Sequence, residues 1–252
     1  MRLSNKTPTP IQSVSPGILP GKNQIYGEVY SINTEILTRL DQIEGYDPKN
    51  QETSLYIRRE ISVKLFNDSS IIKASTYFYN QRIPEYKKIP YGDYRRYRCE
   101  ATEKLQWYIA YGSNISAQRL QSRIKIDGPK KIGYLEGYEL IFNKKGNLGE
   151  NYANVRYRGA NYHCPCVAYK GSLEQLSTLD HYEGEPQDYI RLTMPFRDLE
   201  TQLMYLGQIY LANPLRLTSQ NQISNHYLQH LYDGYSEHGF YCTSLPRYQQ
   251  DD

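Results

Sequence analysis

The chain has 252 residues, a formal net charge of +3 at pH 7 and a mean hydropathy of −0.73. This length suffices for one large or two small domains, and the lack of an 18-residue apolar run excludes a membrane-spanning helix. The weak positive charge does not indicate a nucleic-acid partner, and the first twenty residues hold no apolar stretch typical of a secretory signal. We therefore expect a soluble, cytoplasmic protein without a membrane partner.

Cysteine and tyrosine usage narrows the class further. The four cysteines, at positions 99, 164, 166 and 242, are too few and too irregularly spaced for a disulfide framework, so we expect reduced thiols. There are 27 tyrosines against 5 phenylalanines. Because tyrosine combines an apolar ring with a polar tip, this excess indicates a sheet-rich fold with a polar interior.

The first hundred residues predict an arm followed by a strand, a helix and a hairpin. Residues 1–20 are rich in Pro, Ser and Thr and predict a flexible arm. Residues 24–32 alternate apolar and polar side chains as a strand does, and residues 35–44 form an amphipathic helical pattern. Asn33 or Thr34 can cap that helix, and Gly45 can end it. Residues 55–65 and 71–79 then predict the two strands of a hairpin.

A polar segment rich in Tyr and Arg follows, over residues 86–99. Such side chains can stack and pair with RNA, but no known RNA-binding signature accompanies them. We interpret the segment as leading into a solvated linker at 99–104, between a domain at 21–98 and a domain at 105–252.

The second domain opens with an apolar strand pattern at 107–111 that ends in Gly112, Ser113 and Asn114. Ser116 stands where a helix N-cap would, and polar helix formers follow it. A glycine in such a loop can adopt dihedrals closed to other residues, and neighbouring backbone N–H groups can converge on one point. The pattern therefore predicts strand, tight loop and helix, with the loop forming a small anion cradle; an ordinary turn is the plain alternative.

The order of elements in the first domain returns in the second. Tyr30 and Asp41 are 11 residues apart, as are Tyr169 and Asp180. Likewise 19 residues separate Arg58 from Tyr77 and Arg191 from Tyr210. These spacings, and the shared string Leu-Asp-x-x-Glu-Gly at 40–45 and 179–184, indicate an internal duplication. The first copy is incomplete, because only 29 residues precede Tyr30 and none of them forms a Tyr-Gly-Ser-Asn loop.

Two of these strings carry a resemblance to a known family. Residues 108–115, Tyr-Ile-Ala-Tyr-Gly-Ser-Asn-Ile, resemble the opening signature of the γ-glutamylcyclotransferase family, and residues 179–184 match its Leu-Asp-x-x-Glu-Gly segment. The resemblance covers about 105–245, including Tyr189-x-Arg191 and a closing helix near 225–234, while the first domain resembles the AIG2-like branch. It implies an α+β fold, duplicated, in which each copy is built on a small mixed β-barrel with flanking helices.

The resemblance also implies an enzyme of the lyase or transferase type that acts on a small γ-glutamyl molecule and needs no cofactor or metal. The α-amine of the γ-glutamyl group attacks its own δ-carbonyl, which gives 5-oxoproline and a free amine or amino acid. The family match assigns the acid/base role to Glu183. Substrate binding falls to the loop residues Tyr111, Gly112, Ser113, Asn114 and Ile115 and to Tyr189. Two departures, Ile115 in place of leucine and Glu185-Pro186-Gln187 beside the acid/base, bear on the shape of the pocket.

Several other interpretations carry less weight. Ser113 lacks the Gly-x-Ser-x-Gly context of a nucleophile, and neither the His163-Cys164-Pro165-Cys166 string nor the His226/His230 pair supplies four metal ligands at standard spacing. The main alternative function is a binding or scaffolding module on the same fold, without turnover. Glu44, the counterpart of Glu183 in the first copy, is not expected to be catalytic unless coding sequence before Met1 supplies the missing loop. The sequence leaves open the γ-glutamyl substrate and the oligomeric state.

Overall fold

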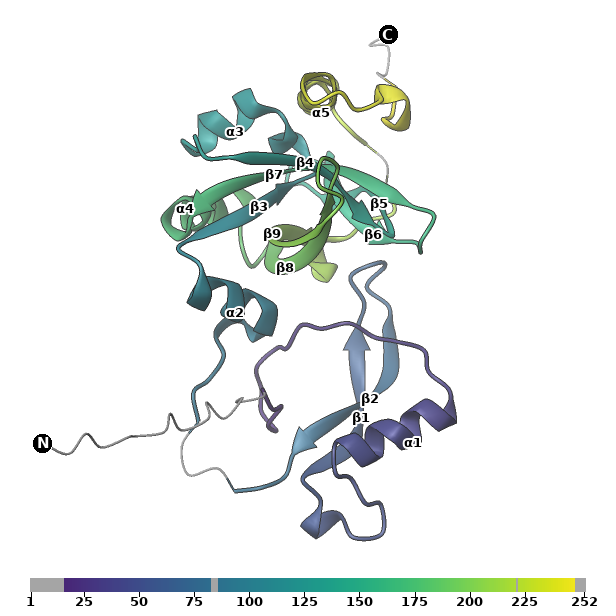
Figure 1. Cartoon of the computed structure of the whole chain (residues 1–252). Helices are drawn as coiled ribbons and strands as arrows, with labels where there is room; N and C mark the ends of the chain where they lie inside the picture. The colour runs from purple at the N-terminus through teal and green to yellow at the C-terminus, as the bar shows by residue number, and fades with distance from the viewer. Residues whose placement is uncertain (1–15, 83–85, 221, 248–252) are drawn as a thin grey trace, which may run out of the picture. The chain divides into compact units, whose positions relative to one another are not determined.

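The computed structural model describes residues 16–82, 86–220 and 222–247, and the chain divides into two compact units (Figure 1). The smaller unit comprises the described residues of 1–23, 29–61 and 74–87. The larger comprises those of 24–28, 62–73 and 88–252. The flexible arm expected at 1–20 falls mostly on residues 1–15, which lie outside the described residues.

The predicted helix and hairpin of the first copy are confirmed. Helix α1 spans Thr34–Ile43, and the Asn33 side chain caps it by accepting a 2.9 Å hydrogen bond from the Ile36 N–H. Gly45 follows with a positive φ of 60°, which glycine adopts without strain. After a short 3₁₀ turn at Gln51–Thr53, strands β1 (Tyr56–Lys64) and β2 (Ile71–Tyr79) form a two-stranded sheet.

The strand predicted at 24–32 is wrong, because this segment has an irregular backbone. Its alternating apolar side chains face solvent: Ile25 is 56% exposed and Val29 is 47% exposed. A strand is stable only where a neighbour supplies hydrogen-bond partners and a surface to pack on. None of the strands in the described part of the chain pairs with 24–32, so the alternation alone does not make it a strand.

The larger unit is built on a closed five-stranded barrel in the order β3-β7-β4-β8-β9. Its strands are β3 (Leu105–Ala110), β4 (Lys130–Glu136), β7 (His163–Ser172), β8 (Tyr189–Asp198) and β9 (Met204–Ala212). All neighbours are antiparallel except β3 and β9, whose parallel pairing at Tyr108 and Gln208 closes the barrel. The mixed barrel predicted for the second copy is therefore confirmed. The described residues of the first copy form no barrel, because their two strands, β1 and β2, make a two-stranded sheet of their own.

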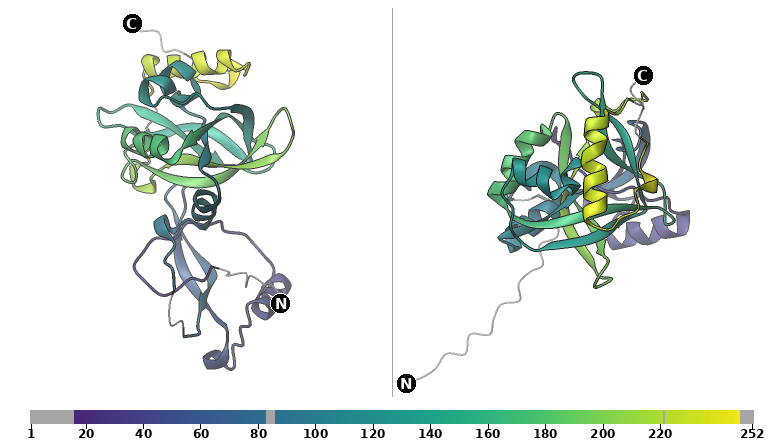
Figure 2. Two further views of the ribbon diagram at one scale, coloured as in Figure 1. Left: turned by 60° about the vertical axis from the view of Figure 1, so that its left-hand side comes forward. Right: turned by 90° about the horizontal axis from the view of Figure 1, so that it is seen from above.

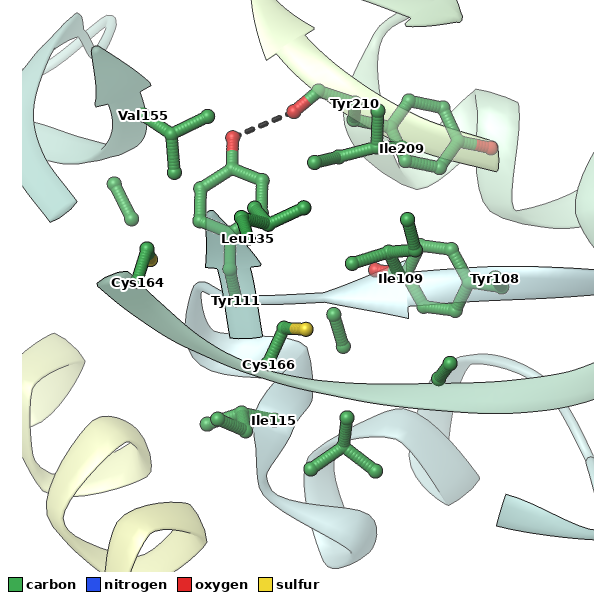
Figure 3. Packing of buried hydrophobic residues seen from close by; sticks show 14 of the residues in the cluster. Tyr108, Ile109, Tyr111, Ile115, Leu135, Val155, Cys164, Cys166, Ile209 and Tyr210 are labelled. Atoms are coloured by element: carbon green, nitrogen blue, oxygen red, sulfur yellow. Dashed lines mark hydrogen bonds between the residues drawn. The ribbon is translucent and has the colours of Figure 1, made fainter. Parts of the chain in front are cut away.

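A hairpin and three helices surround this barrel (Figures 1 and 2). The hairpin is β5 (Tyr138–Lys145) with β6 (Asn151–Tyr157), and the helices are α3 (Ala117–Arg123), α4 (Leu173–Glu183) and α5 (Asn225–Glu237). Short 3₁₀ turns lie at Pro90–Gly92, Ser113–Ile115, Pro214–Arg216 and Cys242–Ser244. Ile109, Leu135 and Ile209 are at most 1% exposed and form part of the core shown in Figure 3. Burying such side chains is the main stabilising term for a barrel of this size.

The segment expected to lead into a solvated linker is instead partly helical and partly buried. Helix α2 spans Tyr94–Thr102, so its last turn covers the first residues of the predicted linker at 99–104. The Asp93 side chain caps it by accepting from the Arg96 N–H at 3.1 Å, and its other oxygen accepts from the Thr193 N–H of β8 at 2.7 Å. Arg96 is 2% exposed and pairs with Glu100 at 2.8 Å. The sequence predicts a solvated side chain for Arg96, because the partners that allow its burial are brought to it only by the tertiary structure.

The matched spacings of the two copies correspond to matched contacts. In the larger unit Asp180 Oδ1 lies 2.9 Å from Arg191 Nε and accepts from the Tyr210 hydroxyl at 2.7 Å. In the smaller unit Asp41 pairs with Arg58 at 2.7 Å and accepts from the Tyr77 hydroxyl at 2.7 Å. Each cluster ties the last turn of a helix to the following hairpin. The duplication read from the spacings therefore extends to side-chain geometry.

Candidate active site

The loop after β3 runs through Tyr111 and Gly112 into a 3₁₀ turn at Ser113–Ile115 and then into α3. Ser116 caps α3 by accepting from the Arg119 N–H. Gly112 has a φ of −95°, so the expectation of dihedrals closed to other residues is wrong. Glycine is needed there because a Cβ would lie 3.1 Å from the Ala153 Cβ and 3.3 Å from the Tyr227 hydroxyl.

Glu183 is the last residue of α4, and Gly184 ends the helix in the left-handed conformation. Leu176 and Leu179 are 0% exposed and fix the helix on the barrel, whereas Leu173, in its first turn, is 36% exposed. The Glu183 side chain, 13% exposed, points toward the loop. Its Oε1 accepts from Asn114 Nδ2 at 2.8 Å and from Arg123 Nη1 at 2.8 Å. The structure thus brings the predicted loop and the predicted carboxylate together.

These residues border a small cavity of about 30 Å³. By that measure the cavity has room for about two water molecules, so a larger ligand can enter only when side chains at its edge move. Arg123 does not line the cavity but pairs with Glu183, which does, and its guanidinium lies 5.5 Å from the centre of the Tyr182 ring. The lining consists of Tyr108, Ile109, Tyr111, Gly112, Ser113, Asn114, Ala153, Glu183, Tyr189, Tyr210 and Tyr227.

Five of the lining side chains are tyrosines, which agrees with the polar interior expected from composition. Burial raises the pKa of all five hydroxyls, so they stay protonated and neutral at physiological pH. Two of them are positioned by the β5–β6 hairpin: the Tyr189 hydroxyl donates to the Ala153 carbonyl at 2.8 Å, and the Tyr227 hydroxyl accepts from the Ala153 N–H at 3.1 Å. The Tyr111 hydroxyl donates to the Tyr210 carbonyl (Figure 3).

Two polar side chains of the cavity, Glu183 and Asn114, differ in how many hydrogen-bond partners their oxygens have. Burial raises the pKa of Glu183 above its ordinary value of 4.5, while Arg123 and the Asn114 amide act in the opposite direction. The hydrogen bonds from Asn114 and Arg123 both end on Glu183 Oε1. Asn114 is 4% exposed, and its Oδ1 has no hydrogen-bond partner within the described residues. A buried acceptor left open in this way is costly unless a ligand donates to it.

The structure separates one predicted residue from the others. Ile115 is 0% exposed and absent from the cavity lining; it contacts α5 instead, where a Cβ on Gly234 would lie 2.4 Å from its Cγ2. Glycine at 234 thus lets α5 approach the loop closely. Residues 185–187, expected to reshape the pocket, do not line the cavity. The remaining predicted residues, Tyr111, Gly112, Ser113, Asn114, Tyr189 and Glu183, do line it.

Sequence reasoning missed several residues at the site. Tyr210 carried a signal in the repeated spacing, but its place in the cavity did not follow from that spacing. Tyr108 opens the signature string at 108–115 and Tyr227 lies in the closing helix near 225–234, but neither was assigned to the pocket. Arg119 and Arg123, on polar helix α3, carried no local signal that distinguishes them from solvated side chains.

The alternative metal sites find no support in the geometry. Cys164 and Cys166 are buried free thiols, and His230 Nε2 lies 2.9 Å from Arg119 Nη1. Among the described residues, no three His, Cys, Asp or Glu side chains are grouped so that they could hold a metal ion. Across the same part of the chain, no helix has the length and apolar character needed to cross a membrane.

A small closed barrel with a helix-terminal carboxylate meeting a Gly-Ser-Asn loop defines a cyclotransferase-like fold and site. The family model described as "Gamma-glutamyl cyclotransferase, AIG2-like" matches residues 6–96 and 108–232, and the chain belongs to that family. The two matched regions correspond to the two copies of the duplication.

One solved structure supports the fold, and two others are similar over part of the chain. The crystal structure of YkqA from Bacillus subtilis is similar with a TM-score of 0.64 and 24% identity, over 84% of this chain and 73% of that one. A human uncharacterized protein gives 0.48 and 17%, over 60% and 92%, and a structure named gamma-glutamyl cyclotransferase gives 0.45 and 18%, over 54% and 80%. No curated protein matches the chain.

Proposed function

We propose that the protein cyclises the γ-glutamyl group of a small molecule to 5-oxoproline and releases the attached amine or amino acid, with Glu183 as the acid/base. The observation that supports this most directly is the contact between Glu183 Oε1 and Asn114 Nδ2, at 2.8 Å on the cavity wall. That contact joins the family's two motifs, which lie 69 residues apart in the chain.

The reaction requires little beyond positioning and one proton carrier. The α-nitrogen of the substrate forms a bond to Cδ while the bond from Cδ to the leaving nitrogen breaks, and the attack is intramolecular. The α-ammonium must first lose a proton, and the leaving nitrogen must gain one. Glu183 accepts the first proton and delivers it to the leaving nitrogen, so no net proton is consumed.

Open hydrogen-bonding groups in the cavity match the substrate's charges. The ammonium group would donate to Glu183 and to the unpartnered Asn114 Oδ1, displacing Arg123 from the carboxylate. The backbone N–H of Asn114, which forms no backbone–backbone hydrogen bond in the described part of the chain, would donate to an oxygen of the glutamyl group. The backbone N–H of Ser113, which faces the Tyr227 hydroxyl, would donate to the same group in place of that hydroxyl. Tyr189 would line the glutamyl side of the cavity.

The test is a matched pair of substitutions in the two copies. The parent, Glu183→Gln and Glu44→Gln would each be incubated with γ-glutamyl amino acids, γ-glutamylamines and γ-glutamyl peptides, and 5-oxoproline would be quantified by mass spectrometry. We expect Glu183→Gln to lower kcat by about 10²- to 10⁴-fold, as expected for loss of a general acid/base, and Glu44→Gln to leave it unchanged. A folded parent that forms no 5-oxoproline across the panel would favour a binding module without turnover.

A further inference from the structure

Arg119 is a cation without a counter-charge at the edge of the candidate site. It lies on α3, is partly buried, and forms no ion pair with any described carboxylate. Its Nε donates to Ser113 Oγ at 2.9 Å, and its Nη1 lies 2.9 Å from His230 Nε2. Burial and the neighbouring Arg123 lower the pKa of Arg119, which reflects the cost of keeping two guanidinium groups together.

His230 holds this guanidinium without neutralising it. Burial, Arg119 and His226 lower the pKa of His230 below its ordinary value of 6.5. At neutral pH the ring is therefore uncharged, and its Nε2 accepts the hydrogen bond from Arg119. Ser113 and His230 thus fix two of the guanidinium nitrogens, and Nη2 forms no hydrogen bond within the described residues.

A γ-glutamyl group carries both an α-ammonium and an α-carboxylate; as proposed, the ammonium takes the place of Arg123 at Glu183, while the loop N–H groups hold the carboxylate. The only carboxylate that accepts from Arg123 among the described residues is that of Glu183. If the substrate's ammonium replaces Arg123 there, both guanidinium groups lack an anion. A partly buried pair of like charges is unfavourable unless an anionic group binds between or beside them.

We propose that Arg119, together with the displaced Arg123, binds a carboxylate on the leaving group, so that the preferred substrates are γ-glutamyl amino acids or peptides rather than γ-glutamylamines. The proposal rests on the proposed function. Arg119 and Arg123 do not line the cavity, but they bond to Ser113 and Glu183, which do. Both guanidinium groups therefore lie next to the cavity, where a leaving group extending beyond it would pass. A guanidinium group donates two parallel hydrogen bonds to a carboxylate, which suits this role.

The first arm of the test uses the parent protein and needs no substitution. γ-Glutamyl-glycine and γ-glutamyl-glycinamide differ only in the charged carboxylate of the leaving group, and both carry the same glutamyl α-carboxylate. We expect kcat/KM for the acid to exceed that for the amide by about 10- to 100-fold, the range expected for hydrogen bonds to a charged group. Equal values would overturn the proposal.

The second arm uses Arg119→Gln, with Lys125→Gln as the control. Lys125 is exposed and follows α3, and its substitution removes one positive charge, as Arg119→Gln does. We expect Arg119→Gln to lower kcat/KM for the acid by about 10- to 100-fold, chiefly through KM, and to change the amide little. Lys125→Gln should change neither. Equal losses on both substrates would assign Arg119 to the glutamyl carboxylate and overturn the proposal. Turnover of neither substrate by the folded parent would show that the proposed function fails, and the inference with it.

Discussion

The two copies of the duplicated unit share one side-chain cluster and differ in what surrounds it. Asp41, Arg58 and Tyr77 repeat the contacts of Asp180, Arg191 and Tyr210. In the larger unit the helix before the cluster buries Leu176 and Leu179, whereas α1 in the smaller unit has no buried residue. The cluster can therefore persist without a barrel behind it.

This difference separates two requirements of the candidate site. The Asp–Arg–Tyr cluster fixes the end of a helix against a hairpin, and it places Glu183 and Glu44 at equivalent points three residues later. Within the described ranges of the chain, only the larger unit adds a loop whose asparagine reaches that carboxylate. Orientation of the helix is common to both copies, and the cavity belongs to one of them.

Removing the aspartate from each cluster should break the similarity. Arg191 is 6% exposed, so Asp180→Ala leaves a buried guanidinium without its main counter-charge, and we expect a loss of about 3 to 5 kcal/mol in the free energy of unfolding. Arg58 is 26% exposed, so water compensates more of the loss, and Asp41→Ala should cost about 1 kcal/mol. Chemical denaturation measures both. Equal losses would show that the two clusters contribute equally to the free energy of unfolding.

The helix caps allow a smaller comparison. Asp93 is 6% exposed and accepts from two backbone N–H groups, one of them on β8. We expect Asp93→Ala to cost about 2 to 3 kcal/mol, because Thr193 loses a charge-assisted partner in a buried place. Asn33→Ala, at the exposed cap of α1, should cost about 1 kcal/mol. If thermal unfolding shows no difference, α2 is not an integral part of the larger unit and the segment behaves as a linker.

The pH dependence of kcat/KM and of stability should distinguish Glu183 from Glu44, and it is the smallest of the expected effects. Glu183 must be ionised to accept a proton, so kcat/KM should fall about tenfold per pH unit below its pKa, which lies above 4.5. Stability has the opposite sign. A folded-state pKa above the unfolded value means that this group stabilises the fold at low pH, and that the contribution is lost as pH rises through the folded pKa.

Glu183→Gln should therefore remove activity without lowering the melting temperature at neutral pH, since the amide can still accept from Asn114. Glu44→Gln is the control, and we expect its pH profile to match the parent's. A large drop in melting temperature for Glu183→Gln would show that its ion pair with Arg123 outweighs the cost of burying the charge.

Much of this protein is encoded locally. The caps at Asn33, Ser116 and the Leu-Asp-x-x-Glu-Gly strings act within one helical turn, so the helices at 34–43, 117–123 and 173–183 follow from a few neighbouring residues. The repeated spacings of Asp, Arg and Tyr identified the duplication, and the family resemblance identified Glu183 and the loop. Each of these signals lies in the order of residues along the chain.

Other features depend on which segments the fold brings together. The barrel closes when β3 pairs with β9 about a hundred residues later, and this closure places Tyr108, Tyr210 and Glu183 around one cavity. The alternation of apolar and polar residues at 24–32 predicted a strand, but none of the described strands pairs with this segment. A side chain at position 112 would crowd Ala153 and Tyr227, and no local sequence pattern indicates that these two residues lie there.

The charges at the site show the same limit most clearly. Arg119 and Arg123 resemble solvated arginines of a helix rich in polar residues, and their sequence neighbours do not distinguish them from such residues. Only packing of α3 between the loop, α4 and α5 gives Arg123 its carboxylate and leaves Arg119 with a serine and a neutral histidine. The sequence determined the repeat, the caps and the acid/base candidate because those signals are local, whereas the tertiary structure decided burial and charge pairing because they depend on residues far apart in the chain.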